Sequence, residues 1–156
     1  MVTKIFATVG STYPLDRLTK ELDSIGENKK YKIFAQIGES EYIPKNIEFT
    51  KFLTYQEMQS KIKWADLIIS HAGAGSIIDL LISKNKFVLF PRLKQYNEAV
   101  DDHQLELCEA FNKKYKIKYS TNAKELVKLL DDKKLTVKIK KDSKLTKEIK
   151  KLIQPL

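Results

Sequence analysis

Short apolar runs alternate along the chain with stretches in which apolar residues recur every three or four positions. The short runs indicate strands buried in a sheet, and the wider spacing indicates amphipathic helices. The predicted strands are 5–9, 33–37, 47–53, 67–69, 87–90 and 115–119, and the predicted helices are 15–24, 55–64, 76–83, 98–114 and 123–131. Strands that alternate with helices predict an α/β domain with a Rossmann-like parallel sheet.

A doubly wound sheet also predicts where a ligand binds. Ligands lie beyond the carboxyl ends of the strands, at the point where the strand order reverses. We therefore expect the loops after the first, fourth and fifth strands to converge on one site; these loops are 10–14, 71–76 and 91–97.

Residues 133–156 differ in pattern from the rest of the chain. Alternating apolar positions (Leu135, Val137, Ile139) give way to positions on one helical stripe (Leu145, Ile149, Leu152, Ile153). We predict a Rossmann-like domain over 1–132 and a basic extension over 133–156 that ends in an amphipathic helix. This helix either packs on its own domain with its lysines in water, or contacts a partner subunit or an anionic membrane face.

The formal net charge of the chain is +9, and most of it lies in the tail, where residues 133–151 hold nine lysines and two acidic residues. The remainder lacks the interleaved aromatic and basic residues of a nucleic-acid stacking surface, so we expect no nucleic-acid partner. No apolar run approaches the roughly 18 residues of a membrane-spanning helix, and a strand begins too early to leave room for a signal peptide. We therefore expect a cytoplasmic protein. The single Cys108 cannot form an internal disulfide and is expected to fill core space.

The most informative segment is 66–80, where an apolar strand runs into a turn of small residues and then into a helix. The glycines permit a tight turn, and the start of the helix presents unpaired amides and about half a positive charge. Such a turn attracts a diphosphate without lysine or metal, although the alternative is a connection that binds nothing. The residues predicted to surround the diphosphate are His71, Ala72, Gly73, Ala74, Gly75 and Ser76, together with Gly10, Ser11 and Thr12 after the first strand.

The glycine pattern does not match two better-known phosphate motifs. No third glycine completes a dinucleotide fingerprint after Gly73 and Gly75, and the Gly-Lys-Ser/Thr ending of a P-loop is missing. The sequence also has no Asp-x-Asp triplet and no metal ligands at suitable spacing. We therefore expect no metal site and no cofactor, with the diphosphate neutralised by amides and the helix dipole.

Four residues near these segments have both structural and binding interpretations. Ser76 and Asp79 have the spacing of a capping box, and the Asp79 carboxylate is also suited to accept hydrogen bonds from a ribose diol. Gln104 falls on the inward face of the helix predicted over 98–114. Its amide either binds sugar hydroxyls or, with His103, caps neighbouring backbone.

Several of these motifs occur in an order that is found in one family. The run ADLIISHAGAGSIID at 65–79 is preceded by TVGST at 8–12 and followed by DHQLE at 102–106. Together they resemble the donor-binding subunit of two-component glycosyltransferases. That group includes the soluble subunit of the eukaryotic dolichol-linked UDP-N-acetylglucosamine transferase and the PssE-type subunits of bacterial polysaccharide synthesis. The resemblance covers most of residues 2–120 and extends to the C-terminal half of MurG-like enzymes.

The resemblance implies the single donor-binding half of a GT-B fold, which binds a UDP-sugar without metal. Transferred by position, the expected contacts are 72–76 with the diphosphate, Asp79 with the ribose, His103 and Gln104 with the sugar, Phe52, Leu53 and Met58 with the uracil, and 10–12 as the family's first loop. The basic tail has no counterpart from which a role transfers.

The resemblance also implies an inverting displacement, which needs a base for the acceptor hydroxyl and stabilisation of the departing UDP. The helix that begins near Ser76 meets the second need. His71 and His103 are the only histidines, and a group on the donor face is poorly placed to act as base for an acceptor arriving opposite. The catalytic residues therefore stay unassigned, and the resemblance places the base in a membrane-associated partner subunit that binds a lipid-linked acceptor.

These inferences lead to one prediction with two alternatives. The chain is predicted to be the UDP-sugar-binding catalytic subunit of a heteromeric, metal-independent, inverting glycosyltransferase of polysaccharide or glycan biosynthesis. It would be cytoplasmic and recruited by its partner to the cytosolic face of a membrane. The alternatives are a non-enzymatic nucleotide-sugar sensor and an NAD-dependent oxidoreductase, the latter disfavoured because the first turn, 10–12, lacks the glycine fingerprint.

Overall fold

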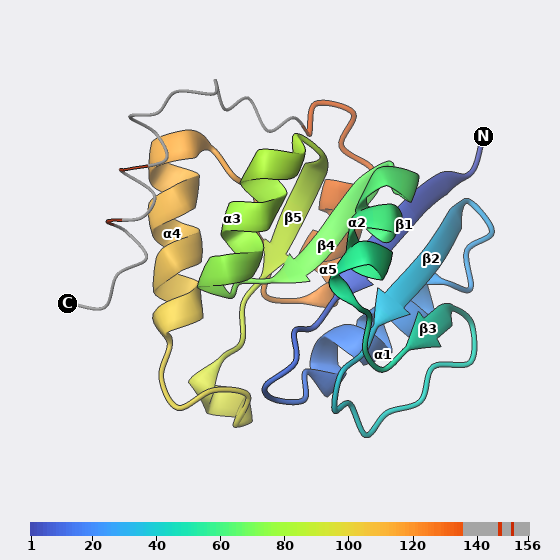
Figure 1. The fold of residues 1–156 in the computed structure, drawn as a ribbon, viewed down its shortest axis with the longest axis horizontal. Helices are drawn as coiled ribbons and strands as arrows, with labels where there is room; N and C mark the ends of the chain where they lie inside the picture. The colour runs from blue at the N-terminus through green and yellow to red at the C-terminus, as the bar shows by residue number, and fades with distance from the viewer. Residues whose placement is uncertain (136–146, 148–150, 152–156) are drawn as a thin grey trace.

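A computed structural model of the chain describes residues 1–135, 147 and 151, and its centre is one five-stranded parallel sheet (Figure 1). The elements are β1 (Thr3–Thr8), α1 (Asp16–Ile25), β2 (Tyr31–Gln36), β3 (Glu48–Thr50), α2 (Tyr55–Trp64), β4 (Leu67–His71), α3 (Ala74–Ser83), β5 (Lys86–Phe90), the 3-10 turn η1 (Lys94–Tyr96), α4 (His103–Tyr115) and α5 (Ala123–Leu130). The strand order is β3-β2-β1-β4-β5, with every neighbouring pair parallel. The predicted Rossmann-like α/β sheet is confirmed.

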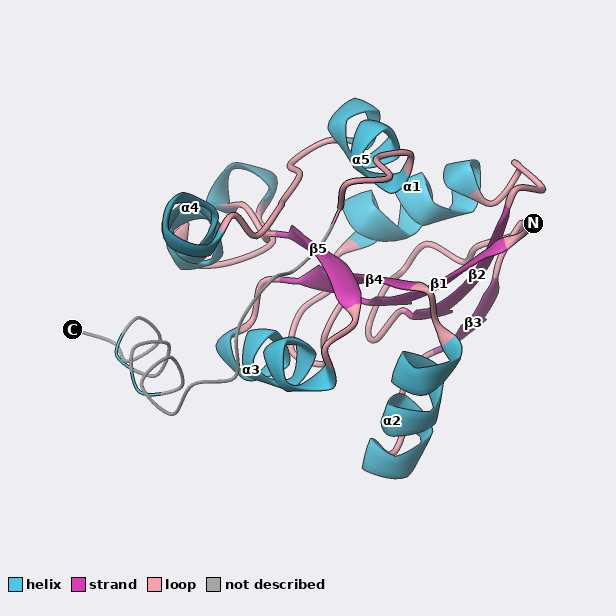
Figure 2. Cartoon of the chain, turned by 90° about the horizontal axis from the view of Figure 1, so that it is seen from above, coloured by secondary structure: helices cyan, strands magenta, loops and turns pink. Residues whose placement is uncertain are grey.

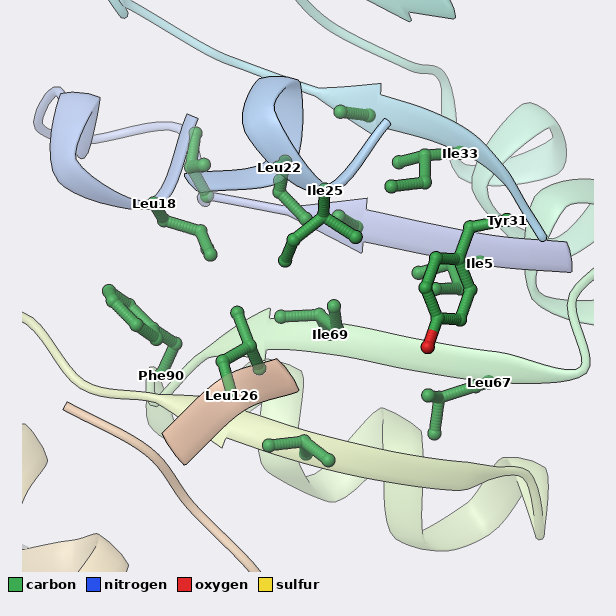
Figure 3. Packing of buried hydrophobic residues seen from close by; sticks show 14 of the residues in the cluster. Ile5, Leu18, Leu22, Ile25, Tyr31, Ile33, Leu67, Ile69, Phe90 and Leu126 are labelled. Atoms are coloured by element: carbon green, nitrogen blue, oxygen red, sulfur yellow. The ribbon is translucent and has the colours of Figure 1, made fainter. Parts of the chain in front are cut away.

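Helices cover both faces of the sheet because each central strand is apolar on both sides. In β1, Ile5 and Ala7 face one hydrophobic cluster and Phe6 faces the other. Helices α1 and α5 lie on the first face and α2 and α3 on the second, while α4 lies beside β5 (Figure 2). Figure 3 shows the first cluster, in which side chains of α1 and α5 meet those of β1, β2, β4 and β5. Two apolar layers thus hold the sheet in place.

The predicted sixth strand, 115–119, is wrong. Tyr115 is the last residue of α4, and Lys116 ends this helix with a φ of 59°. Ile117 is then buried in the second cluster, and only Tyr119 forms an isolated parallel bridge, with Leu89. The apolar run is therefore shared between a helix end and a segment beside β5, and the alternation of burial does not continue long enough for a strand.

The helix predicted over 98–114 begins later, at His103. The Glu98 carboxylate is buried, where it accepts hydrogen bonds from the backbone N–H of Leu93 at 2.9 Å and from Arg17 at 2.8 and 2.9 Å. The Asp101 carboxylate accepts from the backbone N–H of His103 at 3.0 Å. These side chains hold 98–102 in an irregular loop that leads into α4.

Two smaller differences concern segment ends. The strand predicted over 47–53 is the short edge strand β3, and the helix predicted from residue 76 begins at Ala74. Of the alternating apolar positions in the tail, Leu135 is buried in the first cluster, whereas Val137 and Ile139 lie outside the described residues. The four positions of the predicted amphipathic helix, Leu145, Ile149, Leu152 and Ile153, also lie outside them. Within the described part of the chain, no helix combines the length and apolar content that crossing a bilayer requires.

Candidate nucleotide-binding site

The candidate site lies at the carboxyl ends of β1 and β4. From β1 the chain continues to β2 and β3 on one side of the sheet and then returns to β4 and β5 on the other, so the strand order reverses between β1 and β4. Doubly wound sheets bind ligands at this point. A pocket of about 290 Å³ opens here on the face that carries α2 and α3. Its lining includes Gly10, Ser11, Thr12, His71, Gly73, Gly75, Ser76 and Asp79, so most of the predicted diphosphate and ribose residues are brought together.

The turn between β4 and α3 leaves the start of α3 open. Gly73 is the N-cap residue, with an extended backbone, and no side chain caps the helix. The first turn of α2, by contrast, is closed by reciprocal hydrogen bonds between Thr54 and Glu57. The amides of Ala74 and Gly75 therefore lack acceptors within α3, and they carry the positive end of the helix dipole.

Of the two interpretations of Ser76 and Asp79, the capping box is wrong. Helix α3 starts two residues before Ser76, so Ser76 is its third residue and Asp79 its sixth. The Ser76 hydroxyl instead lies 3.1 Å from Nε2 of His71. Asp79 is exposed on the pocket wall, where its carboxylate is free of a capping role.

At two positions the imidazole of His71 leaves no room for a side chain, so that only glycine fits. A Cβ on Gly10 would lie 2.6 Å from His71 Nε2, and a Cβ on Gly73 would lie 2.4 Å from His71 Cε1. Gly10 also has a φ of +79°, which other residues rarely adopt. At Gly75 the situation differs, because a Cβ there would meet nothing within 4 Å. The space above the first turn of α3 is therefore open to a ligand.

His71 is a neutral group in this site. Burial, reinforced by the nearby charge of Arg92, lowers the pKa of His71 from 6.5 to about 4. Its Nδ1 is buried without a hydrogen-bond partner among the described residues. His71 therefore supports the turn through Ser76 and contributes no positive charge near neutral pH.

Arg92, which the sequence interpretation missed, joins the loops after β1 and β5. Its guanidinium is almost fully buried and donates to the carbonyl oxygens of Val9 and, at 2.8 Å, of Pro14. Burial lowers the pKa of Arg92, and the Glu98 carboxylate partly offsets this effect. The only feature of the sequence that pointed to Arg92 was its position in 91–97, one of the three loops predicted to converge on the site. The convergence of these loops is confirmed.

Gln104 joins the loops after β4 and β5. Its side-chain oxygen accepts hydrogen bonds from the backbone N–H groups of Ala72, at 3.2 Å, and Arg92, at 3.0 Å. The backbone-capping interpretation of Gln104 is thus confirmed, which leaves only its NH₂ group for a sugar. His103 is half exposed, with Nδ1 3.9 Å from the Glu106 carboxylate, and neither His103 nor Gln104 lines the pocket.

The segment expected to contact the uracil is only partly at the pocket. Met58 of α2 lines it, whereas Leu53 is half-buried outside the lining and Phe52 is 47% exposed. The pocket also contains Gln36, at the end of β2, which the sequence interpretation did not consider. Among the described residues, no three His, Cys, Asp or Glu side chains are grouped as a metal site.

A parallel sheet with an open helix start at its switch point is the architecture of nucleotide-binding α/β domains. Within that class, the chain belongs to the glycosyltransferase family 28 C-terminal domain family, whose family model matches residues 4–156.

Curated relatives of the chain include enzymes and enzyme subunits. The human UDP-N-acetylglucosamine transferase subunit ALG13 is 30% identical over 130 residues, which cover 75% of this chain and 11% of the relative. The UDP-N-acetylglucosamine--N-acetylmuramyl-(pentapeptide) pyrophosphoryl-undecaprenol N-acetylglucosamine transferase of Vesicomyosocius okutanii is 32% identical over 73 residues, which cover 47% of this chain and 20% of the relative. The chain thus spans a small part of these relatives.

Among solved structures, the solution structure of ALG13 has a similar fold. It superposes with a TM-score of 0.65 at 15% sequence identity, and the match covers 95% of each chain. At this identity the likeness shows the fold alone, and it agrees with the Rossmann-like sheet described above.

Proposed function

We propose that this chain is the UDP-sugar-binding subunit of a heteromeric glycosyltransferase. The observation that carries the proposal is the open start of α3, where uncapped amides face free space above Gly75 in a member of glycosyltransferase family 28. Both curated relatives described above have UDP-N-acetylglucosamine in their names, which supports a uridine nucleotide and makes this sugar the first donor to test.

The geometry of α3 suits the charge that develops during transfer. In an inverting displacement the acceptor oxygen attacks the anomeric carbon, the bond from that carbon to the phosphate oxygen breaks, and UDP departs with added negative charge. Amides aimed at a departing anion stabilise it, by about 10² to 10³ in rate for one well-placed donor. The amides of Ala74 and Gly75 would fill this role without a metal, and the Asp79 carboxylate would accept hydrogen bonds from the ribose.

We assign the base to a partner subunit. His71 has a pKa of about 4, so it is a weak base, and its Nε2 is already engaged with Ser76. His103 lies outside the pocket. The name of the human relative describes a subunit, and that of the bacterial relative includes an undecaprenol-linked acceptor. These names support a partner subunit and a lipid-linked acceptor. We place the partner at the cytosolic face of a membrane, where it would recruit this chain from the cytoplasm.

Titration calorimetry tests the donor. The isolated chain should bind UDP and UDP-N-acetylglucosamine equally well with and without EDTA, and should not bind NAD. Binding of NAD in preference to UDP would contradict the proposal, and loss of binding in EDTA would contradict its metal independence.

A transfer assay tests the division of labour. Membranes that contain the partner should show transfer only when this chain is added, while the chain alone should show none. Robust transfer by the isolated chain would remove the claim that the base lies in a partner. If the chain binds the donor but no transfer occurs with any partner, the result would favour a nucleotide-sugar sensor.

A further inference from the structure

The chain has 29 basic residues, and only two of them are arginines, Arg17 and Arg92. Both lie among the loops at the carboxyl edge of the sheet. The side chain of Arg17 is 17% exposed, and Arg92 is only 3% exposed. A guanidinium keeps its charge when it is buried and donates hydrogen bonds in fixed directions, which the ammonium group of lysine does not. Two permanent positive charges are therefore held inside this edge of the molecule.

Only one of these two charges is neutralised. Arg17 pairs with the Glu98 carboxylate through hydrogen bonds of 2.8 and 2.9 Å. In the part of the chain that the structure describes, no carboxylate forms an ion pair with Arg92, whose side chain donates to carbonyl oxygens. Carbonyl dipoles stabilise a cation without cancelling its charge, and a buried charge is normally paired with an opposite one. The charge of Arg92 therefore remains available to an anion.

The side chain of Arg92 holds both ends of the first turn of the site, 10–13. Its guanidinium donates to the carbonyl oxygens of Val9, directly before this turn, and of Pro14, directly after it. The two ends of the turn are thus fixed to one rigid, planar group.

The backbone of Arg92 is tied to the second turn of the site, 72–76. Its N–H donates to the Gln104 side-chain oxygen at 3.0 Å, and the same oxygen accepts from the N–H of Ala72 at 3.2 Å. Arg92 therefore fixes the distance between the turn 10–13 and the turn 72–76, the two segments to which we assign the diphosphate.

The pocket beside these turns lacks a cation of its own. None of the residues that line it is lysine or arginine, its one histidine, His71, is neutral, and the Asp79 carboxylate adds a negative charge. The charge of Arg92 extends to this lining: burial is the larger cause of the lowered pKa of His71, and the nearby Arg92 is the second. A cation that opposes protonation of His71 attracts a phosphate at the same place.

We propose that Arg92 is a positioning residue for the diphosphate of the donor, which sets the spacing of the two turns and supplies a positive charge from behind them. The inference rests on the proposed function and extends it. The amides at the start of α3 contact the diphosphate, whereas Arg92 acts on it through the turns and through its field. The buried charge takes the part that a lysine or a metal ion plays in other phosphate sites.

The test compares Arg92→Gln with Arg92→Lys. Both replacements keep a hydrogen-bond donor for the carbonyl oxygens and lose the planar fork that binds two of them, but only lysine keeps the charge. Each full-length variant is titrated calorimetrically with UDP and with inorganic pyrophosphate, at low and at high salt, and its melting temperature is measured.

A matched control is Asp23→Asn. The Asp23 carboxylate is also buried, and it holds another loop by accepting from the backbone N–H groups of Lys45 at 2.9 Å and Asn46 at 2.6 Å. Neither Asp23 nor these partners line the pocket. Asp23→Asn should lower the melting temperature and leave the affinity for UDP unchanged.

Both Arg92 variants should melt at a lower temperature than wild type, because neither replacement reaches both carbonyl oxygens. Arg92→Gln should weaken the binding of UDP and of pyrophosphate about tenfold or more, whereas Arg92→Lys should weaken it by no more than about threefold. This difference should persist at high salt, since a buried charge is screened little.

Three results would overturn the inference alone: UDP binding by Arg92→Gln as tight as by wild type, an equal loss in Arg92→Gln and Arg92→Lys, or a similar loss in Asp23→Asn. The second would show that charge is not what matters, and the third that lower stability is sufficient to weaken binding. A wild-type chain that binds neither UDP nor pyrophosphate would overturn the proposed function as well.

Discussion

Replacing Gly75 by alanine separates binding from stability at the start of α3. Gly75 is the second residue of the helix, its φ is not positive, and a Cβ there would touch nothing within 4 Å. Alanine is a better helix former than glycine by about 1 kcal/mol in a helix interior, and by less in the first turn. We therefore expect Gly75→Ala to raise the free energy of unfolding by about 0.5 kcal/mol, or about 1–2 °C in melting temperature.

The same methyl group would occupy the space in which we place the diphosphate. UDP affinity should fall at least tenfold, which corresponds to about 1.4 kcal/mol. The assay is titration calorimetry with UDP beside thermal unfolding, with Gly26→Ala as a contrast. A Cβ on Gly26 would lie 2.4 Å from the Ile47 side chain, and neither residue lines the pocket, so that variant should lose stability and keep UDP affinity. A Gly75→Ala chain that binds UDP as tightly as wild type would refute the placement of the diphosphate.

Three further substitutions test the supports of the site. Gln104→Leu leaves the amides of Ala72 and Arg92 unpaired and should lower the free energy of unfolding by about 1–3 kcal/mol in urea titrations; an unchanged value would mean that these hydrogen bonds are replaced. Arg92→Met removes two charged hydrogen bonds to carbonyl groups and should cost roughly 3 kcal/mol in the same assay, a prediction that a loss under 1 kcal/mol would contradict. His71 has a folded pKa of about 4, below its ordinary 6.5, so the unfolded chain takes up the proton first as the pH falls. The contribution of neutral, buried His71 to the free energy of unfolding is thus fully present above pH 6.5, and roughly 3 kcal/mol of it is lost as the pH falls towards 4. In urea unfolding measured across this pH range, His71→Gln should lack this part of the pH dependence.

Much of the fold could be predicted because burial on both faces leaves a clear pattern. The central strands β1, β4 and β5 are short apolar runs, and the spacing of apolar residues in α1, α2 and α5 follows their buried faces. The run 115–119 was wrongly interpreted as a strand, because its apolar residues belong to two different segments. Tyr115 packs as the last residue of α4, and Ile117 is buried in the second cluster after the helix has ended. Apolar content reports burial, and it does not distinguish a helix end from a strand when the run is this short.

The site was less predictable than the fold. The glycines and the helix start could be found because tight turns restrict residue type, and Gly10 and Gly73 are indeed held against His71. Arg92 carries no such local signal, since its partners Val9 and Pro14 are distant in sequence. The Ser76 and Asp79 spacing matched a capping box by coincidence, because the helix start is set by Gly73. Contacts between segments therefore required the structure.

The most direct test of the account is a nuclear magnetic resonance titration of the 18.1 kDa chain with UDP, which follows the backbone amides one by one. The account predicts that the amides of Ala74, Gly75 and Ser76 shift most, together with those of residues 10–12, and that pyrophosphate reproduces these shifts. Largest shifts in another part of the chain, with the first turn of α3 unaffected, would contradict the claim that this helix start binds the diphosphate.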